Sequence, residues 1–167
     1  ARTQTAFGDF EKSLHDGYGR PALIFNSGYH ANTGLVSALA TKDYTILADK
    51  LVHASIIDGI KLSGAPFERF RHNDMQHLAL LADKISRQGR KLLIIVESVY
   101  SMDGDRAPLR EIAEIKQKHE GALLYVDEAH AVGVEGPGGL GLVMAMGGQA
   151  ADVDVIVGTL GKALGST

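Results

Sequence analysis

Several residue types are scarce or missing in this chain of 167 residues, and each absence excludes a class of protein. Cysteine is absent, which excludes disulfide scaffolds, cysteine-ligated zinc sites and thiol catalysis. No apolar run reaches the roughly 18 residues of a membrane span, and the first residues lack the pattern of a signal peptide. We therefore expect no membrane partner and a cytoplasmic location. The net charge of -3, from 17 Lys+Arg against 20 Asp+Glu, does not favour a nucleic-acid partner.

Glycine, in contrast, is abundant, with 20 residues in the chain. Many glycines follow apolar runs, where they favour tight turns and a close approach of the backbone to a ligand. Two dense groups occupy residues 133–148 and 158–165. We expect residues 133–148 to form a long loop at the surface. Hydrophobic residues make up 45% of the chain and charged residues 22%, which is enough apolar material for a packed core.

Short apolar runs alternate with amphipathic stretches along the chain. The predicted strands cover residues 22–25, 45–48, 67–70, 91–96, 122–126 and 153–157. The predicted helices cover residues 31–40, 55–62, a stretch from the N-cap Asp74 to Ile85, and 109–119. This alternation is typical of βαβ units, so we predict an α/β fold with a mostly parallel sheet and helices on both faces.

Polar residues follow five of the apolar runs and predict a ligand site. In parallel sheets of this kind, ligands bind at the carboxyl ends of the strands. The polar groups occupy residues 26–28, 49–53, 97–98, 127–130 and 158–162. We expect these five groups to lie together at one edge of the sheet.

Two sequence patterns suggest nucleotide binding but lack the context that it requires. Residues 127–130 spell DEAH, the box of a helicase-type ATPase, yet no upstream phosphate-binding loop of the type G-x-x-x-x-G-K-[ST] is present. Residues 136–141 match G-x-G-x-x-G, but a polar loop precedes them and Pro137 lies inside them. A surface loop is the better interpretation of this second pattern.

The seven histidines do not form a metal-binding pattern. His72 and His77 are five residues apart, do not share a helix face, and are best interpreted as part of a solvated loop. The sequence H-E-x-x-H is absent, and we predict no metal site. His53 and His130 differ, because each follows a predicted strand at the expected ligand edge.

Lys162 lies in a glycine-rich loop after a predicted strand, where a lysine can bind an anion or form a Schiff base. A pyridoxal 5'-phosphate (PLP) site also needs a carboxylate for the pyridine nitrogen and a cradle for the phosphate. Asp127 at a strand end can supply the carboxylate. Residues 27–28 at a helix start can supply the cradle, since free N–H groups there favour phosphate. Together with the hydroxyl of Thr159, these residues form a coherent set for PLP.

Several segments, taken in order, resemble the α-oxoamine synthases, which are PLP enzymes with the fold of aspartate aminotransferase. The resemblance is carried by residues 25–32 (FNSGYHAN), 53–55 (HAS), 70–74 (FRHND), 101–105 (SMDGD), 126–130 (VDEAH) and 158–163 (GTLGKA). It spans nearly the whole chain, which makes it specific. It implies the large PLP-binding domain of a PLP-dependent transferase.

The resemblance implies a role for each expected site residue. Lys162 would carry the cofactor as a Schiff base and later move the substrate's Cα proton, and Asp127 would pair with the protonated pyridine nitrogen. His53 would stack on the cofactor ring. The other implied cofactor contacts are His130 at the phenolic oxygen, Gly28, Tyr29 and Thr159 near the phosphate, and Ser101, with Glu97 nearby.

The reaction implied by the resemblance is a decarboxylating condensation of an amino acid with an acyl-CoA or an acyl carrier protein. Within the family, the motifs are most similar to the member that joins L-alanine to a pimeloyl thioester in biotin synthesis. A glycine-dependent member that uses acetyl-CoA shares H-A-S-I-I-D-G and G-T-L-G-K-A-L-G. An inactive, truncated α/β binding module is the alternative that is not an enzyme.

The resemblance also implies a homodimer and a longer protein. The family has an N-terminal segment and a C-terminal small domain that this sequence lacks. We therefore expect residues 1–167 to be one partial large domain, a fragment. The sequence departs from the family in one local feature, the pair Asp127-Glu128, where many relatives carry two aspartates.

Overall fold

The computed structural model of the chain describes residues 2–165. The helices are α1 (Arg2–Tyr18), α2 (Gly28–Leu39), α3 (Ala54–Ser63), α4 (Met75–Arg87) and α5 (Leu109–Gln117), with two 3-10 helices, η1 (Pro137–Gly139) and η2 (Met144–Asp152). The strands are β1 (Tyr44–Asp49), β2 (Phe67–Phe70), β3 (Lys91–Glu97), β4 (Leu123–Asp127) and β5 (Val155–Val157). Strands and helices therefore alternate through most of the chain.

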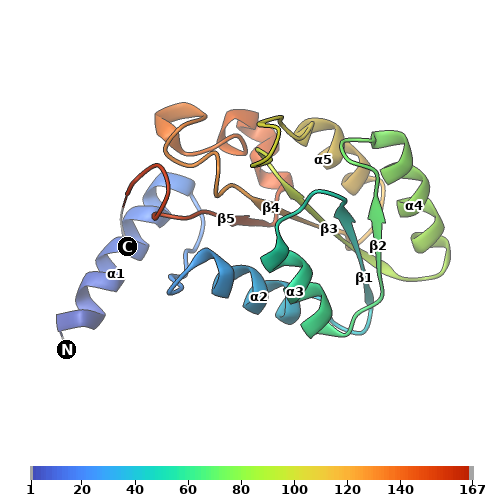
Figure 1. Ribbon diagram of the computed structural model, residues 1–167, viewed down its shortest axis with the longest axis horizontal. Helices are drawn as coiled ribbons and strands as arrows, with labels where there is room; N and C mark the ends of the chain where they lie inside the picture. The colour runs from blue at the N-terminus through green and yellow to red at the C-terminus, as the bar shows by residue number, and fades with distance from the viewer. Residues whose placement is uncertain (1, 166–167) are drawn as a thin grey trace.

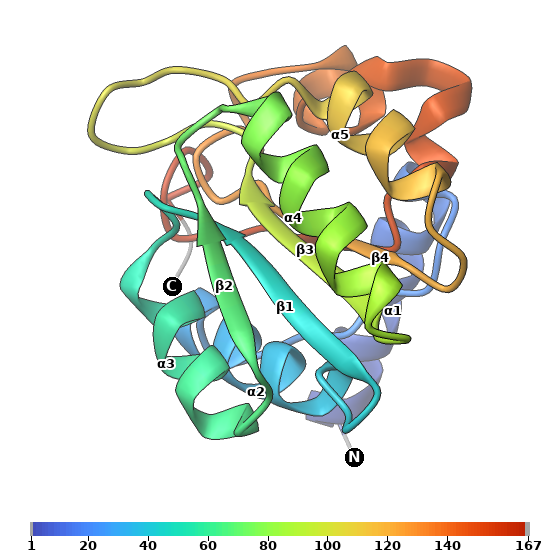
Figure 2. The ribbon, with the colours of Figure 1, turned by 90° about the vertical axis from the view of Figure 1, so that its right-hand side faces the viewer.

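The strands form one parallel sheet in the order β2-β1-β3-β4-β5. Helices α2 and α3 cover one face of the sheet, and α4 and α5 cover the other (Figures 1 and 2). Because the strands are parallel, their carboxyl ends meet at one edge. The predicted α/β fold, with a parallel sheet and helices on both faces, is confirmed.

Two hydrophobic cores lie on the two faces of the sheet, and successive strand residues alternate between them. The core under α2 and α3 contains Ile46, Ala48, Leu93, Ile95 and Tyr125. The core under α4 and α5 contains Leu47, Ile94, Val96, Leu124 and Val126. Burial on both faces explains why these strands have continuous apolar runs rather than an alternating pattern.

The N-terminal part of the chain differs from the sequence prediction. Residues 22–25 are not a strand but a connection between α1 and α2, with Leu23 and Phe25 exposed. A four-residue apolar run does not distinguish a strand from an extended connection. Arg20 anchors this connection, since its guanidinium donates to the carbonyl oxygens of Val153 at 2.8 Å and Ala150 at 3.0 Å. Helix α1 was not predicted at all.

Helix α2 begins at Gly28, three residues earlier than predicted. Ser27 is its N-cap, and the Ser27 hydroxyl oxygen accepts the N–H of His30 at 3.2 Å. A capping serine satisfies one of the N–H groups that have no acceptor within the helix. The earlier start places Gly28 in the first turn.

The glycine-rich segment 133–148 was predicted to be a surface loop. The structure differs in part, because Gly141 and Val143 are buried. Glu128 holds this segment, and its Oε1 accepts the N–H groups of Leu142 at 2.8 Å and Val143 at 3.2 Å. Gly141 has φ 96, and a Cβ there would overlap the Glu128 carboxylate. The glutamate that replaces a family aspartate thus has a local structural role, and Gly141 is required beside it.

Helices α2 and α3 approach each other closely at Gly59. A Cβ on Gly59 would lie 2.9 Å from the backbone carbonyl oxygen of Asn32 and 3.0 Å from Cβ of Val36. These distances are shorter than ordinary van der Waals contacts, so the missing side chain sets the spacing between the two helices.

None of the helices within residues 2–165 has both the length and the apolarity needed to cross a membrane. In the same residues, no cluster of three or more histidine or acidic side chains is arranged to hold a metal ion. The acidic and histidine side chains at the carboxyl edge of the sheet form hydrogen bonds and ion pairs instead.

Candidate functional site

Four polar residues from separate segments lie in contact at the carboxyl edge of the sheet. Lys162 follows β5, and its Nζ lies 2.7 Å from Nε2 of His130, which follows β4. Nδ1 of His130 lies 3.8 Å from Oε2 of Glu97, the last residue of β3. Oε1 of Glu97 accepts the N–H of His53, the N-cap of α3. The structure therefore brings together polar groups at or just after the ends of three strands and one at the start of a helix.

The environment of Lys162 and His130 favours their neutral forms. Burial lowers the pKa of Lys162, although the charges of Asp127 and Glu97 oppose this effect. Burial and the Lys162 charge lower the pKa of His130. An amine of lowered pKa is unprotonated in a larger share of molecules, and the unprotonated amine is the form that acts as a nucleophile or accepts a proton.

Glu97 is a buried acid beside another acid. It lies opposite Asp127 in the register of β3 and β4, and its side chain is 4% exposed. Burial, followed by the negative charge of Asp127, raises the pKa of Glu97 to about 7, although the hydrogen bond from His53 N–H opposes the shift. Glu97 is therefore divided between its protonated and ionised forms near neutral pH.

Asp127 is buried at the end of β4, where two donors hold its carboxylate. Oδ1 accepts the N–H of Ala129 at 2.9 Å, and Oδ2 accepts a hydrogen bond from Nδ2 of Asn32 at 2.8 Å. The two donors fix the position of both carboxylate oxygens. Asp127 is thus suited to face a cationic ring nitrogen.

Asn32 was not among the predicted site residues, although it ends the segment FNSGYHAN. Its side chain is buried, and its Oδ1 accepts a hydrogen bond from the Tyr125 hydroxyl at 2.6 Å. Its Nδ2 donates to Asp127 and to Oγ of Ser55 at 2.9 Å. The available signal was its position four residues after Gly28, which places both on one side of α2. The sequence does not show which polar residue on that side is buried.

The imidazole of His53 belongs to the same network through Ser55. Nδ1 of His53 accepts the N–H of Ser55 at 3.2 Å and lies 2.8 Å from its Oγ. Since Ser55 Oγ also contacts Asn32, a continuous set of hydrogen bonds joins His53 to Asp127.

The start of α2 and the loop after β5 form a cradle. Gly28 and Tyr29 are the first two residues of α2, so their N–H groups have no acceptor within the helix. A Cβ on Gly28 would lie 3.9 Å from Cβ of Thr159, which places the threonine side chain beside the helix start. The Tyr29 hydroxyl is engaged elsewhere, since it donates to Asp58 at 2.9 Å. Free N–H groups next to a hydroxyl are suited to bind a phosphate.

Ser101 is not brought into this network. It lies in an exposed turn at residues 101–103. No hydrogen bond found within residues 2–165 joins its side chain to Lys162, Asp127 or His53. Its contact with a cofactor stays a prediction.

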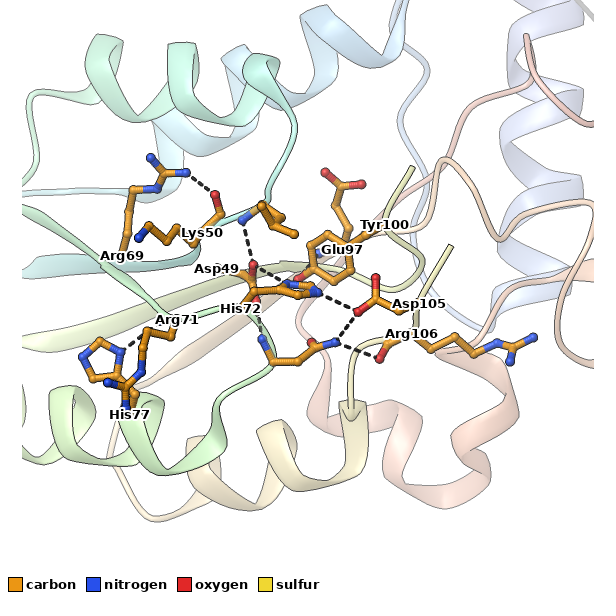
Figure 3. A network of polar contacts seen from close by, with 12 residues as sticks. Asp49, Lys50, Arg69, Arg71, His72, His77, Glu97, Tyr100, Asp105 and Arg106 are labelled. Atoms are coloured by element: carbon orange, nitrogen blue, oxygen red, sulfur yellow. Dashed lines mark hydrogen bonds and ion pairs between the residues drawn. The ribbon is translucent and has the colours of Figure 1, made fainter. Parts of the chain in front are cut away.

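The prediction that His72 lies in a solvated loop is wrong. Figure 3 shows its ring between two carboxylates, with Nδ1 2.9 Å from Oδ1 of Asp49 and Nε2 2.6 Å from Oδ2 of Asp105. The edge of the ring packs on Tyr100, with 4.5 Å between centroids. Burial alone lowers the pKa of His72, but hydrogen bonds to Asp49 and Asp105 outweigh it, so the pKa is raised. His72 therefore joins β1 to the loop that contains Ser101.

Comparisons with known proteins agree with this arrangement. Residues 3–167 match the family Aminotransferase class I and II. The 8-amino-7-oxononanoate synthases of Chlorobaculum parvum and Haemophilus ducreyi are 48% and 51% identical to this chain over 161 and 148 residues. The alignments cover 96% and 87% of this chain but only 41% and 38% of the relatives. The chain thus spans about two fifths of the length of the curated relatives that it matches.

Solved structures give the same result. Serine palmitoyltransferase from S. paucimobilis, with a bound PLP–myriocin aldimine, superposes with a TM-score of 0.84 at 39% identity, over 94% of this chain and 39% of that one. An 8-amino-7-oxononanoate synthase from Francisella tularensis gives a TM-score of 0.78 at 34% identity, over 96% of this chain and 45% of that one. These neighbours confirm the predicted PLP-transferase fold and the resemblance to α-oxoamine synthases.

Proposed function

We propose, from the premise that this chain belongs to the class I and II aminotransferase family, that it forms much of the large domain of a PLP-dependent acyltransferase. The observation that carries the proposal is the pairing of Lys162 Nζ with His130 Nε2 at 2.7 Å, at the sheet edge where Asp127 is buried. An amine of lowered pKa and a fixed carboxylate are the two groups that PLP chemistry requires of the protein.

The residues present fit PLP at three points. Lys162 supplies the amine for its aldehyde, and Asp127 supplies the carboxylate for its pyridine nitrogen. Gly28 and Thr159 face each other at the start of α2, where N–H groups are available for its phosphate. When bound, PLP supplies an electron sink for negative charge at the substrate's α-carbon.

The protein's own contribution is orientation and proton transfer. Nζ of Lys162 is the proposed acceptor of the proton from the substrate's α-carbon, and its lowered pKa suits that role. His130 hydrogen-bonds to this amine. Asp127, held by Asn32 and Ala129, keeps a fixed negative charge in place. His53 is proposed to cover one face of the cofactor ring.

The substrates proposed are an amino acid and an acyl thioester, which condense with loss of carbon dioxide. L-alanine and a pimeloyl thioester are the specific pair, because relatives at about 50% identity are named 8-amino-7-oxononanoate synthase. With these substrates, the proposed role of the protein is in biotin synthesis. The proposal includes a homodimer of the full-length protein, which its mass in solution would test.

The lysine is tested in the full-length protein with Lys162→Ala. We expect wild-type protein to retain the visible absorbance of bound PLP after exhaustive dialysis and the variant to lose it. Lys61→Ala is the matched control, because Lys61 is an exposed lysine on α3. A dialysed Lys162→Ala protein that keeps the wild-type absorbance would overturn the assignment.

The substrates are tested by turnover of the full-length protein with L-alanine or glycine, each with pimeloyl-CoA or acetyl-CoA. We expect the highest kcat/KM with L-alanine and pimeloyl-CoA. A preference for glycine and acetyl-CoA would assign the chain instead to 2-amino-3-ketobutyrate CoA ligase. No turnover with any pair, despite bound PLP, would favour the inactive binding module.

A further inference from the structure

Asn32 is the centre of a buried hydrogen-bond network that links Asp127 to His53. Its side chain is among the most buried polar groups of the chain, with 3% exposure. Both amide hydrogens are used, because Nδ2 donates to Asp127 and to Ser55, and Oδ1 accepts from Tyr125. Because Asn32 is buried and bonded to these partners, we expect its effect on a ligand to act through them.

The direction of each hydrogen bond follows from the chemistry of the partners. An ionised Asp127 can only accept, so the NH₂ group of Asn32 must face it. The second hydrogen of the same NH₂ group points to Ser55 Oγ, which accepts it at 2.9 Å. The Ser55 hydroxyl hydrogen is then free for Nδ1 of His53, 2.8 Å away. Because Nδ1 accepts from Ser55, the proton of a neutral His53 lies on Nε2.

Tyr125 fixes the other end of the amide. It lies inside β4, and its hydroxyl donates to Oδ1 of Asn32 at 2.6 Å. Burial raises the pKa of Tyr125, so its hydroxyl stays protonated and remains a donor. The backbone carbonyl of Asn32 lies close to Gly59, where a Cβ would come within 2.9 Å of its oxygen. Hydrogen bonds to Tyr125, Asp127 and Ser55 therefore hold the side chain of Asn32 in one position.

We propose that Asn32 is a positioning residue for the cofactor. One amide hydrogen fixes the position of the Asp127 carboxylate, and the other orients the Ser55 hydroxyl toward Nδ1 of His53, which favours the tautomer with the proton on Nε2. A single buried amide thus couples the residue that faces the ring nitrogen to the residue that covers the ring. This inference rests on the proposed function, since it assumes that Asp127 and His53 contact PLP.

The main test is Asn32→Leu in the full-length protein, which keeps the volume and removes both donors. We expect the dissociation constant for PLP to rise about 10- to 100-fold, as for loss of one hydrogen bond to a charged group. The rise in unfolding temperature on PLP addition should shrink accordingly. A purely structural role would lower the unfolding temperature of apoprotein and holoprotein alike and leave the dissociation constant unchanged, which would overturn the proposal.

A pH titration of PLP affinity gives a second measurement that does not depend on activity. Asn32→Asp keeps the shape of the side chain but brings a second acid to Asp127. We expect the pH profile of its PLP affinity to differ from that of Asn32→Leu, because the new acid pair loses a shared proton as the pH rises. Identical pH profiles for the two variants would contradict the proposed contact with Asp127.

Two milder variants keep the proposal testable if the Asn32 variants do not fold. Tyr125→Phe should raise the PLP dissociation constant several-fold. Ser55→Ala should change the nitrogen chemical shifts of His53 in NMR, because it removes the hydroxyl donor to Nδ1 and leaves only the backbone N–H of residue 55. The matched controls are Tyr44→Phe and Ser37→Ala, whose hydroxyls bond to Gly121 and Gly34 away from the network. Unchanged PLP affinity in Tyr125→Phe together with unchanged His53 shifts in Ser55→Ala would overturn the coupling.

The proposed function fails separately, since it depends on Lys162→Ala. If that variant loses bound PLP while the Asn32 variants bind PLP as the wild type does, the role of Lys162 stands and only the role of Asn32 is wrong. If Lys162→Ala keeps PLP, the cofactor assignment itself is wrong, whatever the Asn32 variants show.

Discussion

Two buried aspartates lie at the carboxyl edge of the sheet, Asp49 at the end of β1 and Asp127 at the end of β4, and their surroundings differ. Within residues 2–165, the carboxylate of Asp49 accepts hydrogen bonds from three donors at the ends of β1 and β2: His72 at 2.9 Å, Leu51 N–H at 2.8 Å and Asn73 N–H at 3.0 Å. All three donors belong to loops. Asp49 is therefore a loop anchor.

Asp127 accepts two hydrogen bonds in the described part of the chain, and one donor is a side chain from a helix rather than a loop. Its neighbours include Glu97, an acid of raised pKa, and Lys162, an amine of lowered pKa. Perturbed groups of this kind gather at functional sites. Burial of an aspartate therefore does not by itself indicate function. The nature of its partners distinguishes a loop anchor from a reactive site.

The largest expected effects come from neutralising each aspartate in turn in the full-length protein, which tests whether Asp49 and Asp127 have different roles. We expect Asp127→Asn to lower kcat at least about 100-fold, because a fixed charge at the reacting centre is lost. We expect Asp49→Asn to cost about 2 kcal/mol of unfolding free energy, because the buried side chain loses acceptor capacity for hydrogen bonds that its carboxylate now accepts. Urea unfolding and steady-state kinetics measure both effects, and matching losses of kcat in the two variants would contradict the distinction.

The His72 contacts predict a pH dependence for the loop anchor. The pKa of His72 is raised above its ordinary value of 6.5, so the folded state holds this proton more tightly than the unfolded state. The resulting stability is fully present below pH 6.5 and is lost as the pH rises through the higher folded pKa. We expect the stability difference between wild type and His72→Gln to shrink from pH 6 to pH 9, as measured by urea unfolding. His15→Gln, on the exposed side of α1, is the control and should show no such trend.

The smallest of these effects is expected at Glu97, where the variant should be more stable than the wild type rather than less stable. Its pKa rises from an ordinary 4.5 to about 7, so ionisation is harder in the folded state, and stability falls as the pH rises through this range. Glu97→Gln removes the penalty. We therefore expect the variant to gain unfolding temperature relative to wild type between pH 4.5 and pH 8, with Glu114→Gln on α5 as the exposed control. A gain that is the same at both pH values would rule out the raised pKa.

The sequence predicted the parts of the fold that depend on strong local patterns. The continuous run 92–96 predicted a buried strand because both faces of the parallel sheet are covered. The polar residues after each run predicted the site edge because parallel strands end together. Residues 22–25 were predicted wrongly as a strand, since pairing with a neighbouring strand is a tertiary property that four apolar residues do not encode.

The sequence predicted the site residues whose side-chain type implies one chemistry. It predicted less well the residues whose role depends on contacts with distant parts of the chain. Lys162 and Asp127 stand out because an amine and a carboxylate follow strands. Asn32 and His72 were not assigned to contacts because their partners lie 95 and 23 residues away in the sequence. Only the folded chain shows that one faces Asp127 and the other faces Asp49.

The close approach at Gly59 has a consequence for how such a site is altered. Gly59 has no side chain and lies against the backbone of Asn32, one hydrogen bond from Asp127. A methyl group at this position would displace Asn32 by a few tenths of an ångström, and a carboxylate held through a short amide would move with it. Substitutions that change cofactor affinity therefore need not contact the cofactor. In a screen for altered affinity, the contact between α2 and α3 is as informative a target as the residues that line the site.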